Sequence, residues 1–130
     1  MNSVLDRIRN TLTELLDGEV KMEGVWYGAC REKNLNLWNY FVFNRRVTTK
    51  NNQGTKVDLQ TEYQIHIIHE DYIPEGYVNT VIDALQAKAD SGTKLKLTND
   101  EITYDYTFKG NTNMVVEIAT ITFFHPEKRC

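Results

Sequence analysis

The chain has 130 residues, of which 41% are hydrophobic and 25% are charged, so it can bury the core of one domain and is not a disordered tail. Its formal net charge of −3 argues against a protein that binds nucleic acid chiefly by neutralising phosphates, because that function needs a clustered basic face. The two cysteines, Cys30 and Cys130, do not form a disulfide framework, so we expect a reducing compartment.

Residues 3 to about 17 are predicted to form an amphipathic helix. Ser3 can cap its N-terminus, with Asp6 three residues on, and Gly18 is expected to end it. Charges in this segment break the apolar run that a secretory signal needs, and no stretch approaches the roughly 18 apolar residues of a membrane span, so we expect neither. One helix face is apolar through Val4, Leu5, Ile8, Leu12, Leu15 and Leu16.

Two strands are predicted next, over residues 25–32 and 35–48. The second carries large apolar side chains on both faces. Such a strand lies centrally in a sheet, or has one face in the core and the other against a partner. The two faces hold Trp38, Tyr40 and Val42 on one side and Leu37, Phe41 and Phe43 on the other.

Residues 49–56, TKNNQGTK, are polar and contain a glycine, which is typical of a tight turn. This turn would join the second strand to a third, so residues 37–68 are predicted to form a long hairpin. Its outer part, residues 45–58, is mainly polar and charged and has no core to pack on. We therefore expect the hairpin to project from the body of the domain.

The returning strand has the clearest alternation in the sequence, with Tyr63, Ile65 and Ile67 on its apolar face. Period two places His66 on the wet face and His69 on the apolar side. Because the two histidines then point in opposite directions, they are not expected to bind one metal ion. We predict no metal site in this segment.

A second helix is predicted to begin at Pro74, a preferred residue of the first helical turn, and to end near Asp90, with Gly92 just beyond. Its apolar spacing indicates one buried face, so the helix should pack on the sheet. The residues expected on this face are Tyr77, Val78, Val81, Ile82, Leu85 and Ala89.

The last third of the chain is predicted to add two or three strands. Residues 94–98 are a short candidate, residues 101–109 alternate well, and residues 114–124 are apolar on both faces and so belong in the middle of the sheet. The turn at residues 110–113 would join the last two. Residues 1–130 are therefore expected to form a single α+β domain, with a mostly antiparallel sheet of about five to six strands, two helices packed on it and the long projecting hairpin.

No sequence motif indicates catalysis, since the chain lacks a phosphate-binding loop, a dinucleotide-binding glycine pattern and a nucleophile elbow. Cys30 lies in an apolar stretch and is expected to be a buried structural thiol. His125 is expected to be a histidine at a strand end, and Asp105 to make a cross-strand hydrogen bond. We predict no catalytic residues and no cofactor, and a small enzyme with an unrecognised site is kept as an alternative.

The sequence instead suggests a subunit that joins its neighbours, because it predicts sheet edges that need covering and strands with two apolar faces. Head-to-tail contacts between copies close into a ring when the rotation allows. Two runs, YQIHIIHEDYIPEGYVNTVIDAL and KLKLTNDEITYDYTFKGNTNMVVEIATITFFHP, resemble small proteins from the neck and tail gene block of long-tailed phages and prophages of Gram-positive bacteria. Length and element order are similar to the tail terminator group over nearly the whole chain.

The resemblance implies a structural virion protein rather than an enzyme. Such a protein forms a six-fold ring on the last ring of tail-tube protein, stops elongation and offers a surface to the head connector proteins. It is assembled in the host bacterial cytoplasm, and no membrane takes part. DNA passes through the lumen without binding, which suits a mildly acidic subunit.

The end of the hairpin is the predicted interface with a neighbouring subunit or the tube, because it is polar and charged and has no core to pack on. Deleting residues 50–54 should leave the fold intact and abolish assembly. Two other structural functions stay open: another neck or head completion protein, and the tail tube protein, which would polymerise into long tubes. The predicted interface residues are Arg45, Arg46, Lys50, Asn51, Asn52, Gln53 and Gly54.

Overall fold

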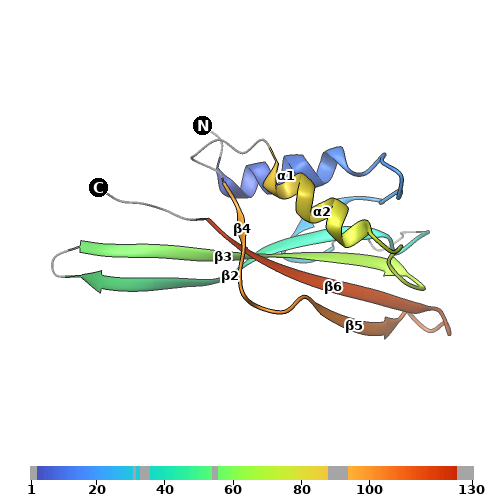
Figure 1. The fold of residues 1–130 in the computed structure, drawn as a ribbon. Helices are drawn as coiled ribbons and strands as arrows, with labels where there is room; N and C mark the ends of the chain where they lie inside the picture. The colour runs from blue at the N-terminus through green and yellow to red at the C-terminus, as the bar shows by residue number, and fades with distance from the viewer. Residues whose placement is uncertain (1–2, 31, 33–35, 54–55, 88–93, 126–130) are drawn as a thin grey trace.

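Two helices lie on the same face of one six-stranded sheet (Figure 1). The predicted α+β fold with a mostly antiparallel sheet is thus confirmed. The computed structural model of the protein describes the backbone alone for residues 51–53 and 56–58. In full it describes residues 3–30, 32, 36–50, 59–87 and 94–125.

The sheet is built from β1 (Val25–Tyr27), β2 (Tyr40–Gln53), β3 (Lys56–Glu70), β4 (Lys96–Leu97), β5 (Thr103–Phe108) and β6 (Val115–Phe124). β6 lies inside the sheet, as predicted for residues 114–124. β3 pairs with one edge of β6, and β4 and β5 follow each other along the opposite edge. All of these pairs are antiparallel, whereas β1 runs parallel to β2.

Helix α1 (Val4–Glu14) begins as the sequence predicts, because the Ser3 hydroxyl oxygen accepts a hydrogen bond from the Asp6 amide at 3.0 Å. The helix ends about three residues earlier than predicted. The amide of Leu15 bonds to the carbonyl of Leu12, which tightens the last turn into a 3₁₀ geometry. Gly18 lies beyond this turn and lacks the positive φ of a helix-ending glycine.

Helix α2 (Tyr77–Gln86) is shorter than predicted at both ends. Gly76 has a φ of 85°, which a helix cannot accommodate, so the helix begins after it and not at Pro74. Ala87 is extended and ends the helix, while the predicted end near Asp90 lies outside the described residues, as do Ala89 and Gly92. The predicted buried face is otherwise confirmed for Tyr77, Val81, Ile82 and Leu85, and Val78 is partly buried.

Arg7 of α1 connects the two helices. Its guanidinium group donates hydrogen bonds to the carbonyl oxygens of Leu85 and Ala87 at the end of α2. The last carbonyls of a helix lack partners within it, and the negative end of the helix dipole favours a cation. One side chain of α1 therefore caps the end of α2 and links the two helices.

The main core lies between the helices and the sheet. The alternation predicted for β3 is confirmed, since Tyr63, Ile65 and Ile67 all face this core and are buried. Tyr77 of α2 stacks on Phe41 of β2 with the ring centroids 6.3 Å apart, and burial raises the pKa of Tyr77 to about 12. The sheet residues of this core that are completely buried are Phe41, Ile65, Ile67, Ala119, Ile121 and Phe123, with Phe43 at 1% exposure.

A second, smaller cluster lies on the face of the sheet opposite the helices. Val42, Ile68 and Val116 are buried there, packed by three partly buried side chains. β2 therefore carries apolar residues on both faces, as predicted, and each face has its own cluster. The three covering side chains are Trp38, Tyr40 and Ile118.

Three predicted boundaries in the first half of the sheet are wrong. β1 stops at Tyr27 and not near residue 32, because Gly28 turns the chain with a φ of 84°. β2 begins at Tyr40, whereas the prediction began at residue 35. Residues 49–53 are paired strand and not turn, since backbone pairing needs no apolar side chains; Gly54 and Thr55 lie outside the described residues.

Candidate functional site

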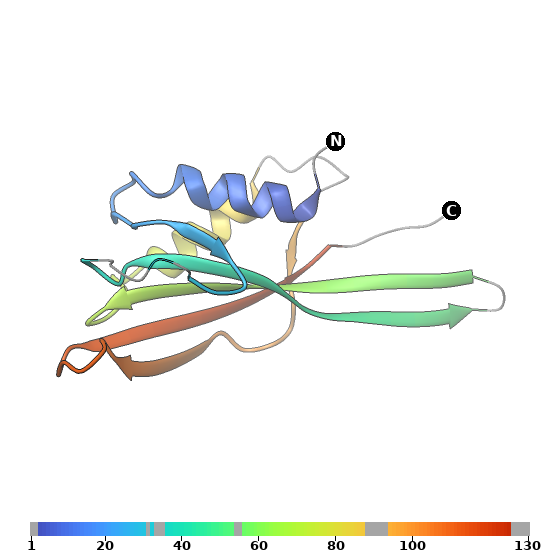
Figure 2. The same cartoon turned by 180° about the vertical axis from the view of Figure 1, so that it is seen from behind.

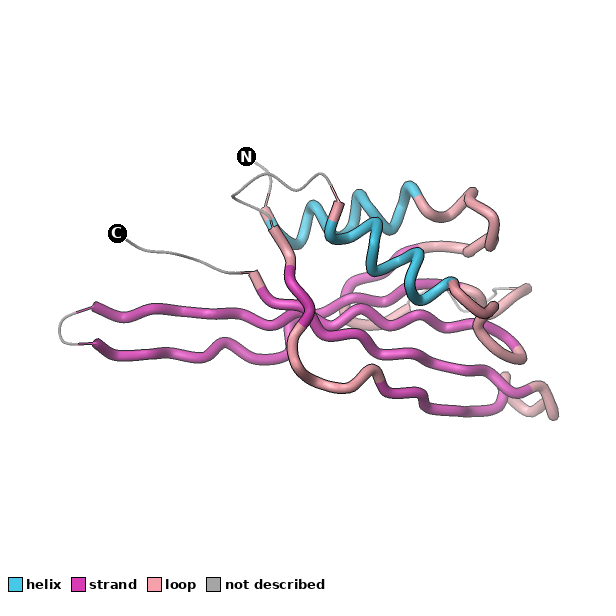
Figure 3. The backbone as a smooth tube through the Cα atoms, viewed as in Figure 1, coloured by secondary structure: helices cyan, strands magenta, loops and turns pink. Residues whose placement is uncertain are grey.

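The outer parts of β2 and β3 extend beyond the rest of the sheet. Residues 48–53 pair with residues 56–61, and the register runs from Thr48↔Thr61 to Gln53↔Lys56. We call these two segments the arm. Pairing of β3 with β6 begins only at Glu62, so within the described strands the arm residues pair with each other alone. Figures 1 and 3 show the arm reaching past the helices and past β6.

The arm therefore presents two strand edges that no described strand covers. Unpaired backbone N–H and C=O groups on such edges are a template for pairing with another chain. The described side chains of the arm add little apolar surface, apart from Leu59, which is 36% exposed. An arm of this kind suits a contact with another protein, in which backbone hydrogen bonds and charges contribute more than apolar burial.

The predicted interface residues fall on the arm and at its root. Arg45 and Arg46 are exposed at the root, where the pairing register shifts between Arg45 and Val47. Lys50 is exposed in the arm and lies opposite Leu59. Nothing is described for Gly54, and only the backbone is described for Asn51, Asn52 and Gln53, which pair with Asp58, Val57 and Lys56.

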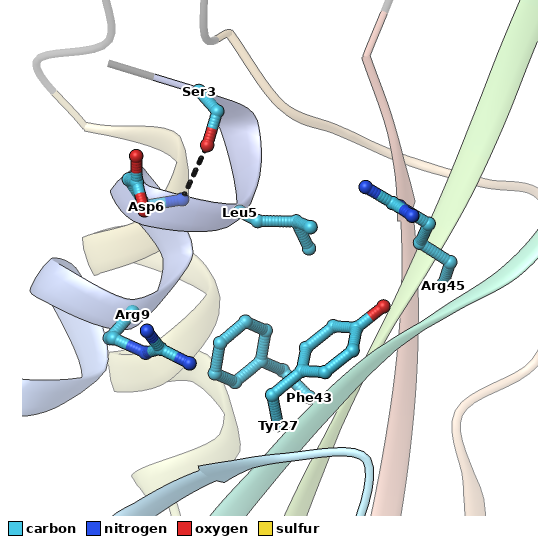
Figure 4. Close-up of a pocket in the computed structure, with 7 residues that line it drawn as sticks. All are labelled: Ser3, Leu5, Asp6, Arg9, Tyr27, Phe43 and Arg45. Carbon is cyan, nitrogen blue, oxygen red and sulfur yellow. Dashed lines mark hydrogen bonds between the residues drawn. The ribbon is translucent and has the colours of Figure 1, made fainter. Parts of the chain in front are cut away.

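The two root arginines differ in their contacts. Arg46 forms an ion pair with Glu62 across the strands, with an N···O distance of 2.9 Å. Its side chain is 48% exposed, so this pair contributes less than about 1 kcal/mol to stability. Arg45 instead lines a pocket of about 260 Å³ between the start of α1, β1 and β2 (Figure 4).

This pocket, which we call the root pocket, is lined by two aromatic rings and by the two arginines Arg9 and Arg45. Phe43 and Tyr27 meet edge to face with their ring centroids 5.2 Å apart. The guanidinium carbon of Arg9 lies 5.5 Å from the centroid of the Phe43 ring, within the range of a cation–π interaction. Sequence reasoning missed this site, because no local pattern places Arg9 beside Arg45. Its lining residues are Ser3, Leu5, Asp6, Arg9, Tyr27, Phe43 and Arg45.

β5 forms an exposed edge of the sheet. All six of its residues are exposed, and within the described strands it pairs with β6 alone. Tyr104, Tyr106 and Phe108 alternate along it and are 47%, 63% and 59% exposed. An edge strand with three exposed aromatic side chains on one face is a surface that a partner can cover.

A second pocket, which we call the β5 pocket, lies between β5 and the start of α2. Its volume is about 320 Å³, and it includes two carboxylates, Glu75 and Glu117. The Tyr106 hydroxyl donates a hydrogen bond to Glu117 at 2.8 Å, and this bond raises the pKa of Tyr106. The other Glu117 oxygen accepts a bond from the Ile73 amide. The lining residues are Ile73, Pro74, Glu75, Gly76, Val78, Asn79, Ile102, Tyr104 and Glu117.

Glu70 connects the segment before β2 to the sheet through hydrogen bonds. One of its carboxylate oxygens accepts hydrogen bonds from the Trp38 amide at 2.6 Å and from the Lys109 ammonium at 2.7 Å. Lys109 also donates to the Asn36 carbonyl. Burial raises the pKa of the Glu70 carboxyl, but the bonds from Lys109 and Trp38 and the nearby positive charges outweigh it, so its pKa lies below the usual value.

Replacing Glu70 with glutamine is expected to lower the free energy of unfolding by about 1–3 kcal/mol at pH 7, because bonds to a charged acceptor are lost. A carboxyl with a depressed pKa stabilises the fold above its unfolded pKa of about 4.3, and loses that effect as the pH falls through its folded pKa. The difference in free energy of unfolding between the original chain and the Glu70→Gln variant should therefore shrink towards pH 3. Urea unfolding at both pH values measures it.

Glu62→Gln is the matched control for this variant, because it removes the same charge from the exposed pair with Arg46. It should cost well under 1 kcal/mol at either pH. Equal losses in the two variants, or a Glu70→Gln loss that persists unchanged at pH 3, would contradict a structural role for the Glu70 charge.

The two histidines of β3 face opposite sides of the sheet, as their register with Thr120 and Glu117 requires. His66 lies on the face away from the main core, as predicted, but it is partly buried there in a polar network. Its Nδ1 lies 2.9 Å from the Thr120 hydroxyl and its Nε2 lies 2.7 Å from the Asn44 side-chain oxygen. Burial lowers the pKa of His66, partly offset by the charge of Asp105.

The other candidate reactive residues, Cys30 and His125, lie in separate parts of the fold. Cys30 is not a buried strand thiol, since it is half-buried after β1 and its Sγ lies 3.7 Å from the Glu32 carbonyl oxygen. His125 is buried and bonded to the Lys94 carbonyl at 2.7 Å, while Cys130 lies outside the described residues. Among the residues that the structure describes, no three His, Cys, Asp or Glu side chains are grouped to hold a metal ion.

The described helices include none that is long and apolar enough to cross a membrane. No protein-family model matches this chain, and no curated protein matches it either.

Proposed function

We propose that this chain is a structural subunit of a long-tailed phage or prophage, which forms a ring on the tail tube, ends tail elongation and offers the surface for joining the head. The observation that carries the proposal is the arm, whose two edges are unpaired within the described strands and can therefore pair with another chain, and whose Lys50 is exposed. Resemblance of the sequence to tail terminators supplies the identity of that partner: neighbouring subunits and the tail-tube protein.

Two further features support a subunit of an assembly. The exposed aromatic edge of β5 adds a second surface that a partner can cover. The net charge of −3 suits a ring through which DNA passes, because like charges keep the phosphates from binding to the wall. The virion is the proposed location, with assembly in the host bacterial cytoplasm and contacts to the head connector proteins.

A tail-tube subunit is the second candidate, because an arm with open edges would also suit contacts between stacked rings. The two functions differ in how far the chain polymerises. A terminator stops at one ring, whereas a tube subunit forms long tubes.

Tail length in a phage that lacks this gene tests the proposal. Negative-stain electron microscopy of the lysate should show overlong or unjoined tubes, and supplying the gene in trans should restore normal tails. Tails of normal length that fail to join heads would assign the chain to the neck or head side instead. Absence of tubes would identify a tube subunit, and intact infectious particles would contradict the structural function altogether.

A further inference from the structure

The arm and the β5 pocket lie at opposite ends of the molecule. In Figure 1 the arm extends to the left, while β5 and the start of α2 lie towards the right, and Figure 2 shows the same separation from behind. The arm of a chain therefore points away from its own β5 pocket. If the two surfaces meet, they must belong to different copies.

The charges of the two surfaces are complementary. The described charged side chain of the arm is Lys50; at the root Arg45 is exposed, while Arg46 is already paired with Glu62. The lining of the β5 pocket contains the two carboxylates Glu75 and Glu117 and no cation. Lys50 in the arm and the two carboxylates of the β5 pocket have opposite charge, so the two surfaces attract each other and favour a head-to-tail orientation of the copies.

The two surfaces also match in the kinds of side chain that they present. Lys50 and Leu59 are directly opposite each other in the arm, so a cation and an exposed aliphatic side chain lie on one face. In the β5 pocket, the exposed carboxylate of Glu75 lies with the apolar surface of Ile102 and Tyr104. The cation of the arm thus has a counterpart in the Glu75 carboxylate, and its aliphatic side chain has one in the apolar surface of the β5 pocket.

We infer that the arm of one copy docks in the β5 pocket of a second copy of this chain. Lys50 then pairs with Glu75, and Leu59 packs against Ile102 and Tyr104. The inference rests on the proposed function as a ring-forming subunit and names the two surfaces that join its neighbours. Because the surfaces differ, the contact is heterologous, and repeating it generates a ring when the rotation closes.

Charge reversal tests the pairing by sedimentation of the purified full chain over a range of concentrations up to about 1 mM. Lys50→Glu and Glu75→Lys should each raise the concentration needed for association by at least about tenfold, since like charges then meet. The double variant in one chain should restore association to within about threefold of the original, because every contact regains an opposite pair.

Two control variants change the net charge by the same amounts elsewhere on the surface. Lys21→Glu and Glu19→Lys alter exposed residues between α1 and β1, and both should associate like the original chain. The inference is overturned by single variants that associate normally, by a double variant no better than the singles, or by an original chain that stays monomeric at about 1 mM.

A disulfide trap supplies a second readout that also captures short-lived contacts. Cys30 and Cys130 are first replaced by serine, and Leu59→Cys and Tyr104→Cys are then placed on separate chains, which leaves Lys50 and Glu75 in place. Oxidation of the mixture should yield the mixed dimer at least about tenfold above either variant alone, because the inferred contact brings these two positions together. A yield of mixed dimer equal to that of either homodimer would contradict the docking.

The inference and the proposed function fail in different ways. Overlong tails in the gene deletion, together with full rescue by both charge-reversed variants, would leave the ring function standing and overturn this contact. Association through the contact in vitro, together with intact particles in the deletion, would confirm the contact and contradict the phage function.

Discussion

Replacing Phe123 with alanine is expected to lower the free energy of unfolding by about 3–5 kcal/mol. Phe123 is completely buried in β6, where its backbone neighbours are Tyr63 of β3 and Leu97 of β4. Its removal leaves a cavity in the main core that the surrounding residues cannot fill. Because a domain of this size is stable by only about 5–15 kcal/mol, this loss is a large fraction of its total stability.

Phe108→Ala is the matched control, since it makes the same change in the neighbouring strand β5, where the side chain is 59% exposed. The expected cost is about 0.5 kcal/mol or less, as for other surface substitutions. Urea unfolding followed by far-ultraviolet circular dichroism measures both variants. Comparable losses at the two positions would mean that β5 is part of the core, and its assignment as an exposed edge would be wrong.

Shortening the arm should abolish assembly and leave the fold intact. The paired register calls for removing residues 50–59 together, because deleting residues 50–54 alone would leave residues 56–59 without partners. An Asn-Gly turn can then join Thr49 to Gln60, which are opposite each other in the register. None of the described side chains in the removed segment belongs to the main core, so the melting temperature should change by only a few degrees.

Assembly of the shortened chain is measured by its ability to restore normal tails to a phage that lacks the gene. No restoration is expected, because the two open edges and Lys50 are removed together. Thr61→Ser is the control: it keeps the arm at full length and retains the hydroxyl pair with Thr48, whose oxygens are 2.8 Å apart. A shortened chain that folds and restores tails as well as this control would rule out the arm as the interface.

The sequence by itself determined the fold class and most of the elements. Alternation in β3 predicted its buried face, because side chains of a strand point to opposite sides with a period of two. Ser3 predicted the start of α1, because a capping hydroxyl acts within one turn. The apolar faces of residues 114–124 likewise predicted a central strand. Each of these predictions rests on contacts between residues close in the chain or on a periodic pattern.

The element ends were predicted less well, because backbone conformation and pairing decided them. Gly28 and Gly76 adopt positive φ and so stop β1 and delay α2. The polar composition of residues 49–53 indicated a turn, yet the ladder of hydrogen bonds with β3 carries them on as strand. Composition does not reveal how far a hairpin stays paired, since the backbone groups are the same in every residue.

Only the tertiary structure decided which distant groups share a surface. His66 meets Thr120 and Asn44, and Lys109 meets Glu70, through strand neighbours that the sequence does not specify. The arm was predicted as an interface from local polarity, but the β5 pocket was not, because it joins the start of α2 to β5 and β6. Local periodicity indicates which side of a helix or strand is buried. Which strands become neighbours depends instead on the order of the strands in the whole sheet.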